Sequence, residues 1–177
     1  MVVYYPHLVG AIDMLREDAR LSQVQFQGPA EAAAKPAVPA APTGAAKTLE
    51  DAENLLNEYL QHPDSPETLA QSRKLFQDAL NQAGEKPKQA AATYGLARIA
   101  LREKDFDNAE RLFTKVLDLD PEPFVKAWSL VYLGKLSLAA GENDSAARFF
   151  QSALKVEGAS DKAREEAVKG VQQGTKK

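Results

Sequence analysis

The sequence predicts an all-α fold, an α-solenoid built from antiparallel helix pairs, and three observations support this prediction. The 177-residue chain is rich in alanine, leucine, glutamate, lysine and glutamine and poor in β-branched residues, a composition that favours helices. One amphipathic pattern recurs in register every 37 residues. Only short breaks separate the helical stretches, so consecutive helices are expected to be antiparallel neighbours.

The recurring pattern reads "QSRKLFQDALNQAG", "NAERLFTKVLDLDP" and "SAARFFQSALKVEG". Each copy places a small residue, a phenylalanine, a second small residue and a leucine at the same helical spacing. The aligned positions are Ser72, Ala109 and Ala146, then Phe76, Phe113 and Phe150, then Ala79, Val116 and Ala153, and finally Leu80, Leu117 and Leu154. A repeat of this length indicates a stack of similar units, with the phenylalanines filling the space between successive pairs.

Start and stop signals place the first two helices of the repeat region. An apolar helical pattern over 48–61 ends before Pro63. Ser65 is an expected N-cap, and Pro66 then takes the first helical position, where its missing N–H costs nothing. The second helix is expected to run over 66–82.

Five further helices follow by the same criteria. Pro87 is expected to help close the preceding helix, Gly141 to supply a left-handed turn, Asn143 or Asp144 to cap a helix, and Ser160 to cap the last one. The expected ranges are 88–102 and 106–119, then 124–140 and 145–156, and finally 160–172.

The chain divides into three predicted parts, an N-terminal segment at 1–27, a linker at 28–47 and the repeat domain at 48–177. The linker, "GPAEAAAKPAVPAAPTGAAK", has prolines that interrupt any long helix, and we expect a semi-extended spacer. The N-terminal segment contains a short amphipathic helix over 6–21 between the strand-like stretches 2–5 and 23–27. Its apolar side carries Leu8, Ile12, Leu15 and Ala19.

Several function classes lack their sequence requirements. A net charge of −3 gives no basic stripe for nucleic acid, and the absence of cysteine excludes disulfides and thiolate metal sites. His7 and His62 have no companion at metal spacing, and the acidic turn "DLDPEPF" lacks the spacing of a calcium loop. No catalytic motif is present, so we expect a non-enzyme without cofactor or metal. No signal peptide or transmembrane stretch is visible, which slightly favours the cytoplasm.

The paired helices resemble the tetratricopeptide repeat (TPR) family. The residues that carry the resemblance are Leu96-Ala97, Ala109, Phe113, Val116 and Pro121 in the middle unit, and Leu130, Leu133-Gly134, Gly141, Ala146, Phe150 and Ala153 in the third. The first unit is degenerate, since Tyr59 and Leu60 stand where Leu-Gly is expected, and the period of 37 residues exceeds the family's usual 34. We place the surplus in "GEKPK" and "PEPF". The resemblance implies about three TPR-like units plus a C-terminal capping helix; a generic helical bundle is the alternative.

The resemblance also implies a concave groove lined by the first helix of each pair. In register, Ala91, Tyr94, Arg98 and Leu101 correspond to Trp128, Val131, Lys135 and Leu138. Two aromatic residues and two cations suit an apolar peptide that carries acidic groups. The family's lysine/asparagine clamp for C-terminal carboxylates is not matched. The alternatives are that Trp128 and Tyr94 pack between repeats and that Arg98 and Lys135 are plain solvated positions.

The leading hypothesis is a non-catalytic module that binds a protein or peptide segment in this groove. The alternatives are a self-associating structural array and the accessory C-terminal region of a larger enzyme. Residues 6–26 are too apolar to stand alone and too few to fold alone. We therefore expect them to dock on the repeats, by exchange with a second copy or within the chain, unless they belong to a domain outside this sequence.

Overall fold

The structure, a computed structural model, describes residues 44–63 and 65–174. The secondary structure of this part is entirely α-helical, as predicted. Its seven helices are α2 (Ala45–Gln61), α3 (Pro66–Gln82), α4 (Lys86–Arg102), α5 (Phe106–Leu117), α6 (Pro123–Ala139), α7 (Asn143–Leu154) and α8 (Asp161–Gly174). The expected helix at 6–21, the strand-like stretches 2–5 and 23–27 and linker residues 28–43 lie outside the described residues.

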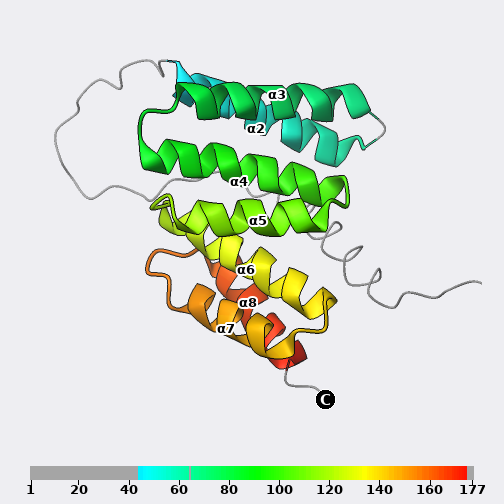
Figure 1. The fold of residues 1–177 in the computed structure, drawn as a ribbon, viewed down its shortest axis with the longest axis vertical. Helices are drawn as coiled ribbons and strands as arrows, with labels where there is room; N and C mark the ends of the chain where they lie inside the picture. The colour runs from blue at the N-terminus through cyan, green and yellow to red at the C-terminus, as the bar shows by residue number, and fades with distance from the viewer. Residues whose placement is uncertain (1–43, 64, 175–177) are drawn as a thin grey trace, which may run out of the picture.

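The helices form a stack of hairpins (Figure 1). Helices α2 and α3, α4 and α5, and α6 and α7 contact each other as pairs, and each pair contacts the next one along the chain. Helix α8 closes the stack by packing on both α6 and α7. The all-α array of helix pairs that the repeat predicts is therefore confirmed.

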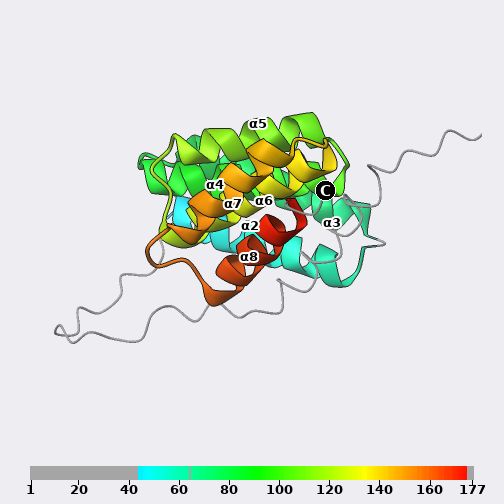
Figure 2. The same cartoon turned by 90° about the horizontal axis from the view of Figure 1, so that it is seen from below.

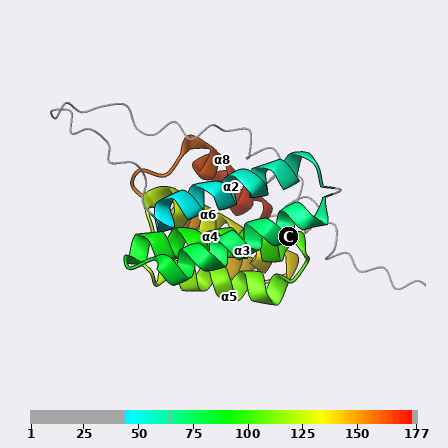
Figure 3. The ribbon, with the colours of Figure 1, turned by 90° about the horizontal axis from the view of Figure 1, so that it is seen from above.

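The first helices of the pairs lie on one side of the stack. Helix α2 contacts α4, α4 contacts α6, and α6 contacts α8. Views along the stack from its two ends place α2 and α8 on one side and α5 on the opposite side (Figures 2 and 3). We call the surface formed by α2, α4, α6 and α8 the first-helix face.

Most helix starts lie one to three residues from the predicted ones, and those of α2 and α4 are the most instructive. Helix α2 begins at Ala45, so the last three residues assigned to the linker, Ala45 to Lys47, are helical. Alanine is the strongest helix former, and no proline lies between Pro42 and the end of the helix at Gln61 to interrupt it. Pro87 does not close the preceding helix, because α3 already ends at Gln82 and Pro87 lies in the first turn of α4. That turn needs no N–H donor for intrahelical bonds, which makes it a suitable place for proline.

The cap predictions have mixed outcomes. The Oγ atom of Ser160 accepts a hydrogen bond from the backbone N–H of Ala163 at 3.3 Å, as expected of an N-cap. Ser65 occupies the cap position of α3, but its side chain makes no cap bond. The prediction for α7 was wrong, because Glu142 takes the cap position and Asn143 is already helical.

Two of the hairpin turns share a left-handed residue in register. Gly141, between α6 and α7, has φ +80°, as the sequence predicts. Lys104, 37 residues earlier between α4 and α5, has φ 62° although it carries a side chain. The turn geometry therefore repeats with the 37-residue period even where glycine does not.

The phenylalanine ladder is confirmed as the core of the array. Phe76, Phe113 and Phe150 are each 0% exposed, as are the small residues Ser72, Ala109 and Ala146 one turn before them. Phe113 of α5 stacks on Tyr132 of α6, with ring centroids 5.0 Å apart and an interplanar angle of 14°. The ring of each second helix thus packs against the first helix of the next pair.

At the other two junctions a glycine takes the place of Tyr132. A Cβ atom on Gly95 of α4 would collide with the ring of Phe76, and one on Gly170 of α8 would collide with the ring of Phe150. Phe150 also faces Gly134 of its own hairpin, where a Cβ atom would come within 2.8 Å of the ring. These glycines let the helix backbones approach the rings directly.

The first helix pair differs from the others, as its degenerate sequence predicts. The hydroxyl of Ser72 donates a hydrogen bond of 2.8 Å to the backbone carbonyl of Ala52, so this junction contains a polar contact where the other pairs have alanine. The pair also has a hydrophobic cluster of its own, separate from that of the later helices. Its buried members are Ala52, Leu56, Leu60, Leu69, Phe76 and Ile99.

The motifs to which we assigned the surplus residues of the repeat each straddle a helix boundary. Gly84 and Glu85 precede α4, whereas the remainder of "GEKPK" belongs to its first turn. Glu122 caps α6, and Pro123 with Phe124 opens it. The surplus is therefore divided between the turns and the first turns of α4 and α6.

Candidate functional site

The predicted groove residues lie on two neighbouring helices of the first-helix face, four on α4 and four on α6. Their large side chains are buried rather than open. Leu101 and Trp128 are 2% exposed, Val131 is 0% exposed and Tyr94 is 6% exposed. Ala91 and Leu138 are half-buried. A partner could contact Trp128 or Val131 only after the packing around them changes, so the expectation of an open apolar lining needs correction.

The physical reason is aromatic packing. Trp128 lies between Phe124, at 6.5 Å between ring centroids, and Tyr132, at 5.9 Å. Tyr94 forms an edge contact with Phe113 at 6.0 Å and a tilted contact with Tyr132 at 6.4 Å. Tyr132 therefore connects the core ring Phe113 to the rings of the first-helix face. This arrangement agrees with the alternative in which Trp128 and Tyr94 pack between repeats.

Arg98 is held by an acidic residue of the preceding first helix. Its Nη1 atom lies 2.8 Å from Oε2 of Glu53 in α2, and its guanidinium sits 5.6 Å from the ring centroid of Tyr94. The Arg98 side chain is 8% exposed and that of Glu53 is 37% exposed. A charge-assisted hydrogen bond with so little solvent around the arginine joins α4 to α2.

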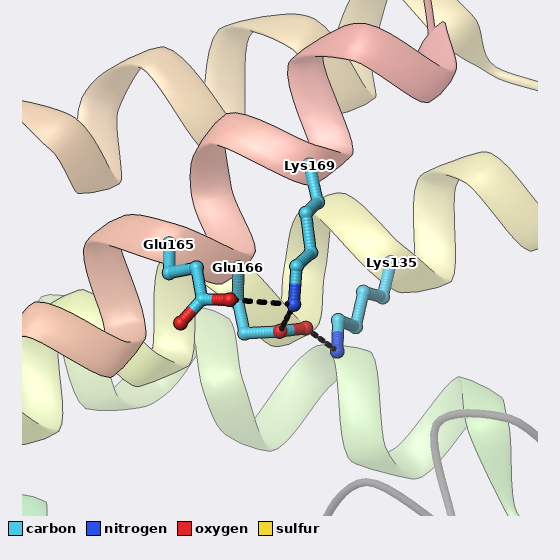
Figure 4. Close-up of polar contacts among 4 residues, drawn as sticks. All are labelled: Lys135, Glu165, Glu166 and Lys169. Atoms are coloured by element: carbon cyan, nitrogen blue, oxygen red, sulfur yellow. Dashed lines mark hydrogen bonds and ion pairs between the residues drawn. The ribbon is translucent and has the colours of Figure 1, made fainter.

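Lys135 is held by an acidic residue of the following first helix. Its Nζ atom lies 2.8 Å from Oε2 of Glu166 in α8, and both side chains are mostly buried, at 14% and 8% exposed (Figure 4). The second carboxylate oxygen of Glu166 lies 3.0 Å from Nζ of Lys169, which also contacts Glu165 at 2.9 Å. Hydrogen bonds with Glu165 and Glu166 raise the pKa of Lys169 well above its usual range, because both carboxylates stabilise its charged form.

The two predicted cations therefore point in opposite directions along the array. Arg98 pairs towards α2 and Lys135 towards α8, although they occupy the same position of the 37-residue register. Neither is a plain solvated position, because each has a carboxylate partner within the described residues. The prediction that these cations attract acidic groups of a partner gains no support from this pairing and stays a prediction.

Sequence reasoning missed the residues that hold this face together. The separation between Glu53 and Glu166 is not a multiple of 37 residues. The two glutamates therefore do not occupy equivalent positions of the repeat, and the repeat gave no reason to select them. Tyr132 was overlooked, although it lies 37 residues after Gly95 and could have been noticed as a register position. Gly170 could have been found in the same way, since it follows Phe150 at nearly the spacing that separates Phe76 from Gly95.

The described residues form neither a metal site nor a membrane-spanning helix. Within 44–63 and 65–174, no group of three or more histidine, cysteine, aspartate or glutamate side chains could hold a metal ion. No helix in that part of the chain is both long enough and apolar enough to cross a membrane. His62 is exposed beside the end of α2. The first-helix face is thus the candidate site that the described residues offer.

Comparison with known families decides what the repeat is. Residues 100–165 match a family model described as tetratricopeptide repeat. Residues 100–165 therefore form a tetratricopeptide repeat region. The match begins near the end of α4, covers α5, α6 and α7 and ends within α8, so the resemblance read from the sequence is confirmed for these tetratricopeptide repeats. A search of curated proteins gave no match.

Tetratricopeptide repeats generally mediate protein–protein interaction and are typically non-catalytic modules. The matched region contains the α6 half of the candidate site and ends one residue before Glu166, the α8 residue that pairs with Lys135. A protein partner therefore fits the family and the helix array together.

Proposed function

We propose that this chain is a non-catalytic interaction module whose first-helix face binds a protein or peptide segment. The observation that carries the proposal is the continuous contact of α2, α4, α6 and α8 along one side of a tetratricopeptide array. Such a face presents several parallel helices to a single extended or helical ligand.

The chemistry of the face indicates what kind of segment would bind. Aromatic side chains are common anchors in protein interfaces, and here Tyr94, Trp128 and Phe124 lie within one group of rings. Glu53, the more exposed partner of Arg98, leaves that pair accessible from one side. We infer a ligand with two features. An apolar side chain inserts next to these rings, and an acidic group replaces the Glu53 carboxylate as the partner of Arg98.

A peptide selection on the full chain tests the proposal. A display library of random peptides is selected on the immobilised protein, and the Kd of an enriched peptide is measured by calorimetry. The peptide is then titrated against Leu138→Gln, which alters the half-buried Leu138 of α6, and against Leu112→Gln, which alters the half-buried Leu112 of α5. Both leucines pack against the same hydrophobic cluster, so the second variant is a matched control for folding.

We expect Leu138→Gln to weaken binding by about tenfold or more, the loss typical of an interface anchor, and Leu112→Gln to leave it unchanged. Circular dichroism spectra confirm that both variants keep the helical fold. Equal losses of peptide affinity in the two variants would contradict binding at the first-helix face. So would a selection that enriches no more peptides on this protein than on an unrelated helical protein.

A further inference from the structure

We propose that the surface of α6 and α7 beneath α8 is a docking site for a helix of a partner protein, and that α8 occupies this site as an exchangeable internal ligand. The fitting partner helix has small residues where α8 has Ala163, Ala167 and Gly170, and a carboxylate where α8 has Glu166. The proposal goes beyond the function proposed above, because it concerns the surface that α8 covers.

The first argument is how α8 is held in place. Its buried residues are Ala163, Glu166, Ala167 and Gly170. Each of the other six described helices buries at least one large apolar side chain, such as Leu56 in α2 or Phe150 in α7. Burial of apolar surface is the main favourable term in packing, so α8 gains less from it than any other described helix. Helix α8 is therefore the described helix that detaches at the lowest cost.

The second argument is the chemistry of the surface that α8 covers. Phe150 of α7 turns its ring towards α8, and a Cβ atom on Gly170 would collide with that ring, so an occupant needs a glycine at this point. Nζ of Lys135 in α6 lies 2.8 Å from Oε2 of Glu166, and the two side chains are 14% and 8% exposed (Figure 4). Departure of α8 would uncover an aromatic ring and a cation, and a helix with matching chemistry would cover both again.

The third argument is the position of α8 in the stack. It is the last of the described helices, it packs on α6 and α7, and residues 155–160 connect it to α7 (Figure 1). In a repeat array each unit contacts its neighbours, so an end helix can leave while the helices further along stay packed. Such local opening costs less than global unfolding. The site can therefore become available in a molecule that is otherwise folded.

Competition between α8 and a partner helix follows from this arrangement. A partner helix binds only the molecules in which α8 has opened, so its apparent Kd equals the intrinsic Kd divided by the open fraction. A substitution that weakens the docking of α8 should therefore tighten the binding of a separate helix. The same substitution made in the separate helix should weaken that binding. These opposite responses distinguish exchange at the α8 site from binding elsewhere on the molecule.

A peptide titration on the full chain tests the exchange. The probe is a fluorescein-labelled peptide with the sequence of residues 159–174, and its binding is measured by fluorescence anisotropy. It is titrated against the unsubstituted chain and against the variants Gly170→Ala and Glu166→Ala. The matched controls are Gly174→Ala and Glu165→Ala, because a Cβ atom on Gly174 has ordinary contact distances and the Glu165 side chain is 63% exposed.

We expect Glu166→Ala in the chain to tighten binding of the peptide by about tenfold, since the loss of one buried charged hydrogen bond raises the open fraction by that order. Gly170→Ala should tighten it by about threefold or more, because the helix propensity of alanine offsets part of the collision with Phe150. Neither control should tighten binding. Circular dichroism spectra verify that each chain keeps its helices.

The peptide is then substituted in its turn. Glu166→Ala in the peptide removes the carboxylate that would meet Lys135, and it should weaken binding to the Glu166→Ala chain by about tenfold. The same change thus tightens binding when it is made in the chain and weakens binding when it is made in the peptide.

Three results would overturn the proposal. Equal affinity of the peptide for all five chains, or no measurable binding to the Glu166→Ala chain, would mean that the α8 site does not accept a separate helix. A Glu166→Ala peptide that binds as tightly as the unsubstituted one would show that its carboxylate does not meet Lys135. An average mass that rises with protein concentration, measured by light scattering without peptide, would assign the site to α8 of a second copy. None of these outcomes depends on whether the random-peptide selection succeeds, so the two proposals fail independently.

Discussion

At the scale of single residues, the array depends on how the phenylalanine of each second helix packs on the next helix. That helix offers the phenylalanine either a glycine or the ring of a tyrosine. Phe76 meets Gly95, Phe113 stacks on Tyr132, and Phe150 is enclosed between Gly134 and Gly170. Because these contacts recur at each junction, a side chain that enlarges a glycine should act like overpacking of a core. The junction between α7 and α8 offers the clearest test, since α8 carries one glycine that touches a phenylalanine ring, Gly170, and one that does not, Gly174.

We predict that Gly170→Ala destabilises the protein and Gly174→Ala does not. A Cβ atom at Gly170 would collide with the ring of Phe150, whereas one at Gly174 has ordinary contact distances, with Leu138 Cδ2 at 3.7 Å. Overpacking typically costs about 1–3 kcal/mol, while alanine gains up to about 1 kcal/mol over glycine in a helix. Urea unfolding followed by circular dichroism measures both changes. A Gly170→Ala variant as stable as Gly174→Ala would show that α8 moves away without cost.

At the scale of the element, α8 is bound to the array by charge as well as by packing. Glu166 is the central residue, because it bridges Lys135 of α6 and Lys169 of its own helix (Figure 4). Its neighbour Glu165 contacts Lys169 alone and its side chain is 63% exposed. Helix α8 is therefore integrated into the first-helix face and does more than shield the end of the stack from solvent.

We predict that Glu166→Ala destabilises the protein by about 1–3 kcal/mol, because it removes a buried carboxylate that lies 2.8 Å from the mostly buried Nζ of Lys135. Glu165→Ala, one residue away, should change the unfolding midpoint little, since exposed ion pairs are screened by water. Thermal unfolding of both variants gives the comparison. If the two substitutions are equivalent, the ion pair between α6 and α8 does not stabilise the array.

At the scale of the whole molecule, the core is divided in two. The pair of α2 and α3 has its own hydrophobic cluster with Ile99, while the cluster of the later helices runs from Ala90 to Ala167. The family match at 100–165 also lies outside the first pair. In repeat proteins each unit contacts only its neighbours, so parts of the array can open separately.

We predict that Leu56→Ala lowers the protection of α2 and α3 in hydrogen exchange much more than that of α6 and α7. Leu56 is 0% exposed in the first cluster, and its truncation should cost about 2–5 kcal/mol within that unit. Exchange measured by mass spectrometry on peptides from each helix resolves the two regions. A uniform loss of protection along the chain would instead indicate that the described helices open as one cooperative unit.

The sequence by itself determined the helices, their pairing and the buried ladder. Amphipathic periodicity and the 37-residue register are local or repeated properties, so Phe76, Phe113 and Phe150 could be assigned to the core without coordinates. The small residues beside them followed from the same register. Helix starts were less certain, as at Ala45 and Pro87, because a proline near a boundary suits either the end of one helix or the first turn of the next.

Tertiary structure alone decided the character of the first-helix face. The register correctly put Trp128 and Val131 on α6, but their burial depends on neighbouring helices and rings that no single helical pattern encodes. The ion pairs are the plainest example. Arg98 and Lys135 are equivalent in the repeat, yet one finds its carboxylate in the preceding helix and the other in the following one. Glu53 and Glu166 are 113 residues apart and follow no common register, so only the packing of the helices brings each within 2.8 Å of its partner.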